Sequence, residues 1–313
     1  MSFSSIKRLV LLLAVAFVAF ASASKSFAEP YFQGTKSCEE CHKDEYKAWE
    51  RTKHYSSYRS AHKHKDAKKI AKAVGGKKSM KRNKNCVVCH YATEQKKAED
   101  KPKVRFGPAC ESCHGASSVW EPIHSDYGGK DAKRENETGE HKTKRIADSV
   151  AAGLVWSTMN YEVAAQCMKC HGLARSEISG DAFAKMLGAG HPINQSFEIV
   201  MFSQGKMRHW PKERSKARLS RLFVAGQAAK LVSATEAAAK TEDAKYKEAQ
   251  TKRATDAKAV LQAIPQAAAG SQSPSDEKAR KMMQAIGQQD LAGQIGGLMK
   301  CAAADQENLW QCN

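Results

Sequence analysis

Aromatic side chains and long apolar runs are both scarce in this chain of 313 residues. Phe, Trp and Tyr make up 7% of it and charged residues 27%, and the mean hydropathy is −0.59. Only one stretch is apolar enough to enter a bilayer, which excludes a polytopic membrane protein. Ten cysteines are too few for a disulfide-dense scaffold of this length. The chain is long enough for a sizeable core, yet it has few large apolar side chains to fill one.

The one apolar stretch has the organisation of a secretory signal peptide. Two basic residues precede an apolar run at residues 9–20, and small residues follow it. The run is short for a membrane span, so we expect residues 1–28 to be a signal peptide cleaved after Ala28 or Ala23, with a retained anchor as the alternative. This interpretation places the protein in the periplasm, where cysteines are expected in disulfides, in cofactor bonds or on metals. The chain from Glu29 keeps a formal charge of +15, because the first 28 residues hold three basic residues and no acid.

Eight of the ten cysteines lie in four copies of the pattern C-x-x-C-H. This is the attachment pattern of c-type haem, in which two thiols bond to the vinyl groups of one porphyrin and the adjacent His binds the iron. We call the four copies the first to fourth frames. They consist of Cys38, Cys41 and His42; Cys86, Cys89 and His90; Cys110, Cys113 and His114; and Cys167, Cys170 and His171. We therefore expect four covalently bound haem c groups, each with one iron.

Two other uses of paired cysteines fit the pattern less well. A zinc ribbon uses two C-x-x-C pairs, and a thioredoxin-like site needs one pair near a βαβ unit. Neither use explains a His directly after every pair. Four haems also account for the scarcity of aromatic side chains, because the chain can fold around their flat apolar surfaces.

Histidines outside the frames are candidates for the sixth position of each iron. A filled sixth position suits electron transfer, whereas an open one permits chemistry on a small ligand. The seven candidates are His54, His62, His64, His124, His141, His191 and His209. Three of them, His62, His64 and His141, lie in Lys-rich stretches of weak periodicity, so we interpret these three as solvated side chains.

Two of the candidates belong to longer motifs. A W-x-x-T-x-H stretch follows the first frame and ends at His54, and His124 lies ten residues after the third frame. Together with the frames, over about residues 34–175, these motifs resemble the tetrahaem cytochrome c-554 type family. The resemblance implies a mainly helical, exported electron carrier with short helices, long loops and haems in close pairs. It also implies that His54 and His124 are distal ligands, that most irons have two histidine ligands, and that the iron of His90 is five-coordinate.

Beyond the fourth frame the chain departs from that family. His191 precedes a proline and His209 lies one residue from another, and proline favours extended turns that can lay a side chain across a haem. We expect both histidines to bind iron, with ordinary loop histidines as the alternative. Which iron each would serve stays open. Four methionines occupy helix-like positions that are more typical of core filling than of ligation: Met159, Met186, Met201 and Met207.

The frames and the composition suggest two regions after the signal peptide. We expect a tetrahaem cytochrome domain over residues 29–216 and an Ala- and Lys-rich helical region over residues 217–313. Within the first region, short helices are expected at Asp44–Arg51 and Ala67–Val74. Residues 121–160 are expected to be rich in loops, and the fourth frame follows in a helical pattern.

The C-terminal region has the pattern of a helical hairpin. A long helix is expected at Ala228–Ile264, ended by a proline, and a second helix should begin with Ser273 as its N-cap. Cys301 and Cys312, the two cysteines outside the frames, are expected to form a disulfide, with two free thiols as the alternative. This region could pack on the haem domain, mediate self-association or contact a partner.

Basic residues outnumber acidic ones, with 51 Lys and Arg against 33 Asp and Glu. The segment 63–84, which we call the basic segment, holds ten Lys or Arg and one acid, Asp66. It is either a docking surface for an acidic redox partner or a solvated face that balances haem propionates. A nucleic-acid partner is disfavoured by export and by the lack of interleaved aromatics or of a binding motif. No stable membrane span is expected after signal cleavage, and the oligomeric state stays open.

These features predict a mainly α, multihaem c-type cytochrome of the periplasm that transfers electrons between redox partners through closely packed haems. We predict no catalytic residue and expect an electron carrier rather than an enzyme. The alternative is a haem-dependent oxidoreductase that acts on a nitrogen or sulfur compound at one five-coordinate iron. No local acid–base constellation supports this alternative.

Overall fold

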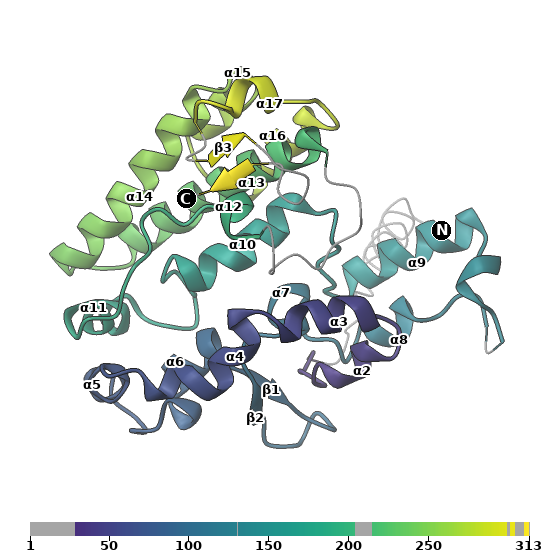
Figure 1. The fold of residues 1–313 in the computed structure, drawn as a ribbon, viewed down its shortest axis with the longest axis horizontal. Coiled ribbons are helices and arrows are strands. Elements are labelled where there is room, and N and C mark those ends of the chain that lie inside the picture. Colours follow the sequence, from purple (N-terminus) through teal and green to yellow (C-terminus); the bar gives the residue numbers. More distant parts are fainter. Residues whose placement is uncertain (1–28, 130, 204–214, 299–300, 304–309, 313) are drawn as a thin grey trace, which may run out of the picture.

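Helices joined by loops make up most of the chain in this computed structural model, which confirms the predicted mainly α class (Figure 1). The structure describes residues 29–129, 131–203 and 215–298, and the backbone of residues 301–303 and 310–312. The signal peptide predicted at residues 1–28 and the iron ligand predicted at His209 lie outside the described residues. None of the described helices is long and apolar enough to cross a membrane.

The first three frames lie among short helices and one small β-hairpin. The hairpin separates the second frame from the third, and its strands are antiparallel with Ala92 opposite Phe106. The elements of this part are α2 (Lys36–Glu39), α3 (Lys43–Glu50), α4 (Lys53–Ser60), η1 (Ala61–Lys63), α5 (Ala67–Ala73), η2 (Met80–Arg82), α6 (Lys84–His90), β1 (Ala92–Glu94), β2 (Lys103–Phe106), α7 (Cys110–His114), α8 (Glu121–His124), η3 (Arg134–Asn136) and α9 (Gly139–Ala151).

Both short helices expected in this part are present, as α3 and α5. The expectation that residues 121–160 are rich in loops is wrong at their centre, where α9 runs for 13 residues from a Thr138 N-cap. The two residues that α9 buries are the polar Arg145 and Ser149. An analysis of apolar periodicity does not register such a helix, because its inward face is polar.

The fourth frame and the C-terminal region form the upper half of the molecule in Figure 1. Helices α13 and α14 lie against each other, and α13 also packs along the frame helix α10. The elements are α10 (Asn160–His171), α11 (Gly180–Gly188), α12 (Ile199–Ser203), α13 (Lys216–Ala239), α14 (Ala244–Gln262), α15 (Pro265–Ala268), η5 (Ala269–Ser271), α16 (Asp276–Ile286), α17 (Ala292–Ile295), β3 (Cys301–Ala303) and β4 (Trp310–Cys312).

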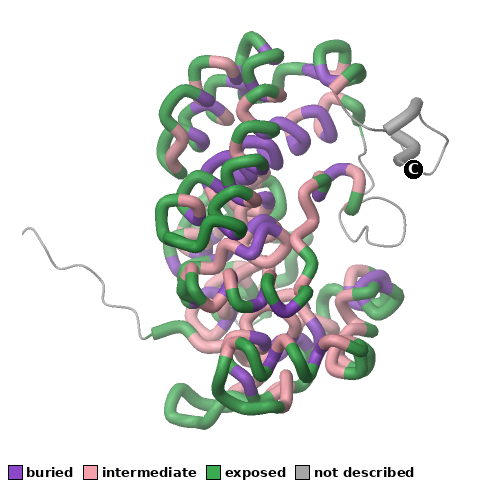
Figure 2. The backbone as a smooth tube through the Cα atoms, turned by 90° about the vertical axis from the view of Figure 1, so that its left-hand side faces the viewer, coloured by how far each residue is buried: buried purple, intermediate pink, exposed green. Residues whose placement is uncertain are grey.

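The main hydrophobic cluster of the described chain lies in this half. It joins α10 to α12, α13, α14, α16 and α17 through buried side chains such as Met168, Val200, Phe223 and Leu261. Figure 2 shows buried residues gathered there, while the segment with the first three frames is mostly half-buried or exposed. The apolar clusters of that segment are small, as around Trp49 and around Trp120. The cluster includes residues on both sides of residue 216, and the division into domains there stays a prediction.

The C-terminal helices differ from the expected hairpin in two places. The helix expected at Ala228–Ile264 is two helices, because Asp243 accepts a hydrogen bond from Tyr246 N and so caps a new helix, α14. The N-cap of α16 is Ser275 rather than Ser273: the Ser275 hydroxyl accepts from Lys278 N (3.2 Å). Between strands β3 and β4, position 301 lies opposite position 312. The disulfide between these cysteines stays a prediction.

Candidate functional site

Each frame lies at the C-terminal end of a helix or directly after one. The second, third and fourth frames end α6, α7 and α10, and the first frame runs from α2 into the start of α3. None of the eight frame cysteines forms a disulfide. All eight thiols therefore remain for thioether bonds.

Three frame histidines each face a histidine from outside the frames. The ring centroids are 6.1 Å apart for His42 and His124, 5.9 Å for His171 and His54, and 5.8 Å for His90 and His191. The pairs join residues that are far apart in the sequence. Each pair combines one predicted proximal ligand with one predicted distal ligand.

These separations fit an iron between the two rings. A metal–imidazole bond is about 2 Å long, and the centre of each five-membered ring lies beyond its ligating nitrogen. Two imidazoles on opposite sides of one metal therefore have centroids about 6 Å apart. The chain thus holds three ring pairs at the separation that a bis-histidine haem iron requires, and residues of the first, second and fourth frames would hold those haems.

The position of His191 does not favour the five-coordinate iron expected at His90, and the coordination of that iron stays a prediction. His191 faces His90 at 5.8 Å, which is the separation of a ligand pair. The expectation came from the family resemblance, which ends near residue 175. The loop that carries His191 lies beyond that limit, so the resemblance had no information about it.

Hydrogen bonds and burial keep several frame and distal histidines in the neutral form that binds a metal. Val155 O lies 2.8 Å from His114 Nδ1, and Pro192 O lies 2.8 Å from His191 Nδ1. A carbonyl that accepts the Nδ1 proton leaves the lone pair of Nε2 for a metal. Burial lowers the pKa of His90, His124 and His171 to about 4 each. These rings are therefore neutral at neutral pH, as metal binding requires.

The W-x-x-T-x-H stretch positions His54 through two hydrogen bonds and one close contact. Trp49 Nε1 donates to Pro108 O (2.9 Å), which ties α3 to the entrance of the third frame. Thr52 accepts from Tyr55 N (3.2 Å) and caps α4, so that His54 lies in the first turn of that helix. The backbone carbonyl of His54 lies so close to Gly107 that a Cβ there would overlap it.

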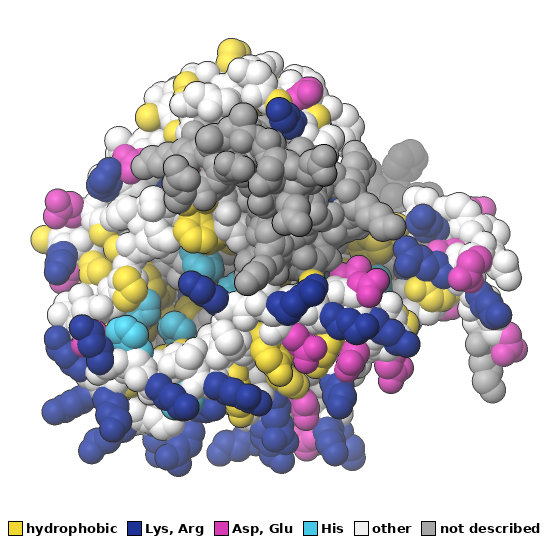
Figure 3. Space-filling model, viewed as in Figure 1, with side chains coloured by type: hydrophobic (Ala, Val, Ile, Leu, Met, Phe, Trp, Pro, Cys, Tyr) yellow, Lys and Arg dark blue, Asp and Glu magenta, His cyan; other side chains and the backbone are white. Residues whose placement is uncertain are grey.

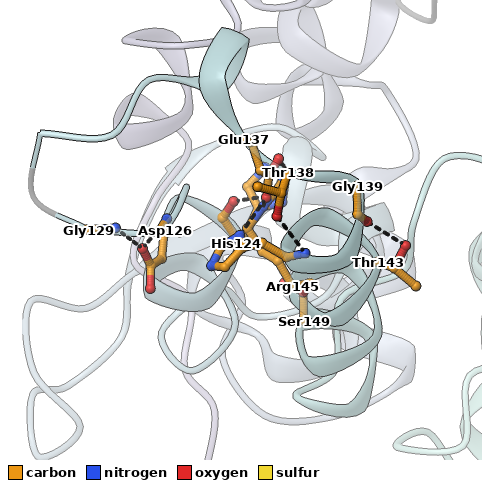
Figure 4. A network of polar contacts seen from close by, with 11 residues as sticks. His124, Asp126, Gly129, Glu137, Thr138, Gly139, Thr143, Arg145 and Ser149 are labelled. Atoms are coloured by element: carbon orange, nitrogen blue, oxygen red, sulfur yellow. Dashed lines mark hydrogen bonds and ion pairs between the residues drawn. The ribbon is translucent and has the colours of Figure 1, made fainter.

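His124 is held by a polar network between α8 and α9 (Figure 4). Arg145 Nη1 donates to His124 O (2.7 Å), while Arg145 Nε and Nη2 donate to the Glu137 carboxylate (2.6 and 2.7 Å). His141 Nδ1 lies 2.8 Å from Glu137 Oε1. The hydrogen bonds from Arg145 lower the pKa of Glu137 to about 2. The sequence does not indicate this network, because a charged stretch that precedes a helix is usually a solvated surface.

The histidines interpreted as solvated have different surroundings. His64 lies 3.8 Å from Asp66 and is exposed, as expected. His62 departs from the expectation, because its Nδ1 is buried without a hydrogen-bond partner and burial lowers its pKa. Sequence analysis also missed Phe197, whose ring lies parallel to His171 at 4.2 Å. A single Phe in a loop gives no signal of such a contact.

The four frames lie next to one another in an order that differs from the chain order. Cys38 of the first frame and Cys110 of the third lie close enough to shift each other's pKa, as do Cys89 of the second frame and Cys170 of the fourth, while α7 of the third frame contacts α10 of the fourth. Burial, and after it the neighbouring Cys170 of the fourth frame, raise the pKa of Cys113 in the third frame to about 11. The spatial order is therefore first, third, fourth, second, with the second frame at one end.

The basic segment lies at that end. Figure 3 shows Lys and Arg gathered along the lower edge of the molecule, the edge formed by α5, α6 and the hairpin in Figure 1. Lys81 Nζ lies 3.5 Å from the ring centroid of Tyr58 and 5.9 Å from that of Tyr91. Tyr91 directly follows His90. The basic surface thus reaches the second frame through two aromatic rings.

The C-x-x-C-H frames and the facing imidazoles at about 6 Å define a c-type cytochrome. Comparison with known proteins agrees with this class: residues 37–115 match the family described as Cytochrome c554 and c-prime. Over 123 residues the chain is 31% identical to Cytochrome c-554 of Nitrosomonas europaea, a match that covers 37% of this chain and 52% of that protein.

The segment with the first three frames is thus similar to the cytochrome c-554 family. The match spans about half the length of that relative. No solved structure matches the chain. The fourth frame and the C-terminal helices lie outside the residues that the family match covers.

Proposed function

We propose that the protein is a periplasmic tetrahaem cytochrome that transfers electrons between redox partners through closely spaced haems. The observation that carries this proposal is the set of three histidine pairs, each 5.8–6.1 Å between centroids. When bound, each haem supplies an iron that accepts and releases one electron. The paired imidazoles would hold the irons, and in the segment of the first three frames the chain, which has only small apolar clusters of its own, would fold around the porphyrins.

The remaining iron belongs to the third frame, and His209 stays its predicted second ligand. This assignment follows because the other three predicted distal histidines each face a histidine of another frame. With His209 bound, every iron has two histidine ligands and the protein is a carrier. The oxidoreductase alternative requires that this one position be open to a small molecule.

The spatial order of the frames supports a linear path for electrons. Cysteines of neighbouring frames lie close together at the first–third and second–fourth junctions, and α7 of the third frame contacts α10 of the fourth. Electrons would enter or leave at the first and second frames, which lie at the two ends. An acidic partner would dock on the basic segment and exchange electrons with the haem of the second frame.

The haem count and the spin count of the purified, exported protein test the function. We expect the mass of a chain that begins at Glu29 plus four haems, none of them extractable by acid acetone, because thioether bonds are covalent. The low-temperature electron paramagnetic resonance spectrum of the oxidised protein should contain only low-spin irons. Three or fewer haems would contradict the tetrahaem proposal. A high-spin signal from about a quarter of the iron would favour the oxidoreductase.

Ionic strength tests the docking surface. The exported chain stays positive even after four haems add about eight propionate charges, so electron transfer from an acidic partner should slow as salt rises. Lys68→Glu/Lys69→Glu on α5 should slow it at low salt, whereas the control Lys245→Glu/Lys258→Glu on α14 should have a much smaller effect. Equal effects of the two pairs would exclude the basic segment as the docking site.

A further inference from the structure

Two buried charges of opposite sign contact the third and fourth frames. Glu111, inside the third frame, is 3% exposed, and Arg253, on α14, is 1% exposed. Buried charged side chains are normally paired, because removal from water is costly. Neither of these forms an ion pair with any side chain in the described part of the chain.

Four hydrogen bonds from neutral donors satisfy Glu111. Its carboxylate accepts from the backbone N–H of Gln33 (3.0 Å), Gly34 (2.8 Å) and Ser117 (2.9 Å), and from the Ser117 hydroxyl (2.5 Å). All four groups donate to the Glu111 side chain, which acts here only as an acceptor. Because the residue stands between Cys110 and Cys113, its negative charge lies within the haem attachment itself.

Arg253 brings a positive charge from the C-terminal region to the fourth frame. Its Nη1 donates to Gly172 O (3.2 Å), directly after His171, and to Gln250 Oε1 (2.6 Å). Its Nη2 lies 3.7 Å from Sδ of Met168, inside the frame, and its Nε is buried without a partner. Burial lowers the pKa of Arg253 to about 10, so the guanidinium stays charged at neutral pH.

Other residues keep this guanidinium in place. On the same face of α14, Gln250 Nε2 donates to Gly172 O (2.9 Å) and Tyr246 Oη donates to Leu173 O (2.5 Å). A Cβ on Gly172 would overlap the Arg253 guanidinium, so the residue after the fourth frame must be small. The nearby Arg175 differs from Arg253, because its charge is paired with Glu177 at 3.0 Å.

We propose that Arg253 raises the reduction potential of the fourth-frame haem and that Glu111 lowers that of the third-frame haem. Reduction adds one electron to a haem, so a nearby positive charge stabilises the reduced form and a negative charge destabilises it. One electron then passes favourably from the reduced third haem to the oxidised fourth. This inference rests on the proposed tetrahaem function and gives the C-terminal helices a part in it.

Spectroscopic redox titration of the holoprotein tests the inference. Arg253→Met removes the charge but keeps an unbranched chain of similar length, and Arg253→Lys keeps the charge. The control is Arg280→Gln. Arg280 pairs at the surface with Glu162 of α10, the helix that ends in the fourth frame. We expect Arg253→Met to weaken reduction of one haem about tenfold, a shift of ~59 mV to lower potential. Arg253→Lys and Arg280→Gln should leave all midpoints near those of the parent.

The identity of the shifted haem is checked in a His54→Ala background. There the fourth-frame iron loses its facing ligand and gives a high-spin signal, so the Arg253→Met shift should appear in that signal. Glu111→Gln provides an independent arm, in which one other midpoint should rise. This arm also decides the question if Arg253→Met yields no holoprotein.

Three outcomes would overturn the inference. Arg253→Met could leave every midpoint potential unchanged, Arg253→Lys could shift a midpoint potential as far as Arg253→Met does, or Glu111→Gln could leave every midpoint potential unchanged. Haem counting on the parent protein separates this failure from failure of the proposed function. Four haems with unmoved midpoints would refute only the role of the buried charges.

Discussion

Replacing Gly107 by Ala should release one iron ligand without altering any ligand residue. A Cβ at position 107 would overlap the carbonyl oxygen of His54 and come within 2.6 Å of Ser57 Oγ. Ordinary contacts of this kind are about 3.5 Å, so the backbone near His54 must move by about 1 Å or more. A metal–imidazole bond of about 2 Å cannot stretch that far. Forcing extra volume into such a packed contact typically costs about 1–3 kcal/mol.

The expected result has a spectroscopic part and a thermal part. About a quarter of the iron should become high-spin in the electron paramagnetic resonance spectrum, and Tm should fall by roughly 2–4 °C for each kcal/mol lost. The control is Gly139→Ala at the start of α9, where a Cβ meets nothing within 4 Å; it should change neither. A fully low-spin Gly107→Ala variant with an unchanged Tm would show that this contact does not position His54.

Other predictions concern the remaining ligands and the tail. Glu137 has a pKa of about 2 in the folded chain against an ordinary 4.5, so its contribution to stability is present above pH 4.5 and is lost as pH falls toward 2. Glu137→Gln removes the carboxylate that binds Arg145, so the Tm of the variant should fall less between pH 4.5 and 2 than that of the parent. The same fall of Tm in both proteins would contradict this role of Glu137. His191→Ala should convert one low-spin haem to high-spin, and an unchanged spin count would refute the pairing with His90. Thiol alkylation of the unreduced protein should label neither Cys301 nor Cys312, since their strand positions lie opposite each other; labelling of both would exclude the disulfide.

The attachment sites could be predicted from the sequence because their chemistry is local. Two thiols and a His within five residues define one haem site, whatever the rest of the chain does. Short motifs also predict His54, His124 and His191 as ligands, and each of them faces a frame histidine. Their partners could not be predicted, since pairing depends on how distant segments pack.

Other features were hidden because they depend on buried polar groups. Arg145 and Arg253 belong to charged or mixed helices that look solvated in the sequence, yet both are buried. The break between α13 and α14 depends on one capping carboxylate, Asp243, within a long Ala-rich pattern. Apolar periodicity shows which face of a helix is hydrophobic. It does not show which polar side chains will find hydrogen-bond partners on another element and so become buried.

The crossing of the three histidine pairs has a consequence for how the chain is held together. With an iron between each pair, the protein contains three closed loops, from His42 to His124, from His54 to His171 and from His90 to His191. The loops overlap in the sequence, so each loop contains one histidine from each of the other two pairs. Closing loops of this length removes chain entropy from the unfolded state, as a long-range disulfide does. The haems would then act as crosslinks for the part of the chain that has little apolar core, and the unloaded polypeptide should be far less cooperative in folding there than in its C-terminal helices.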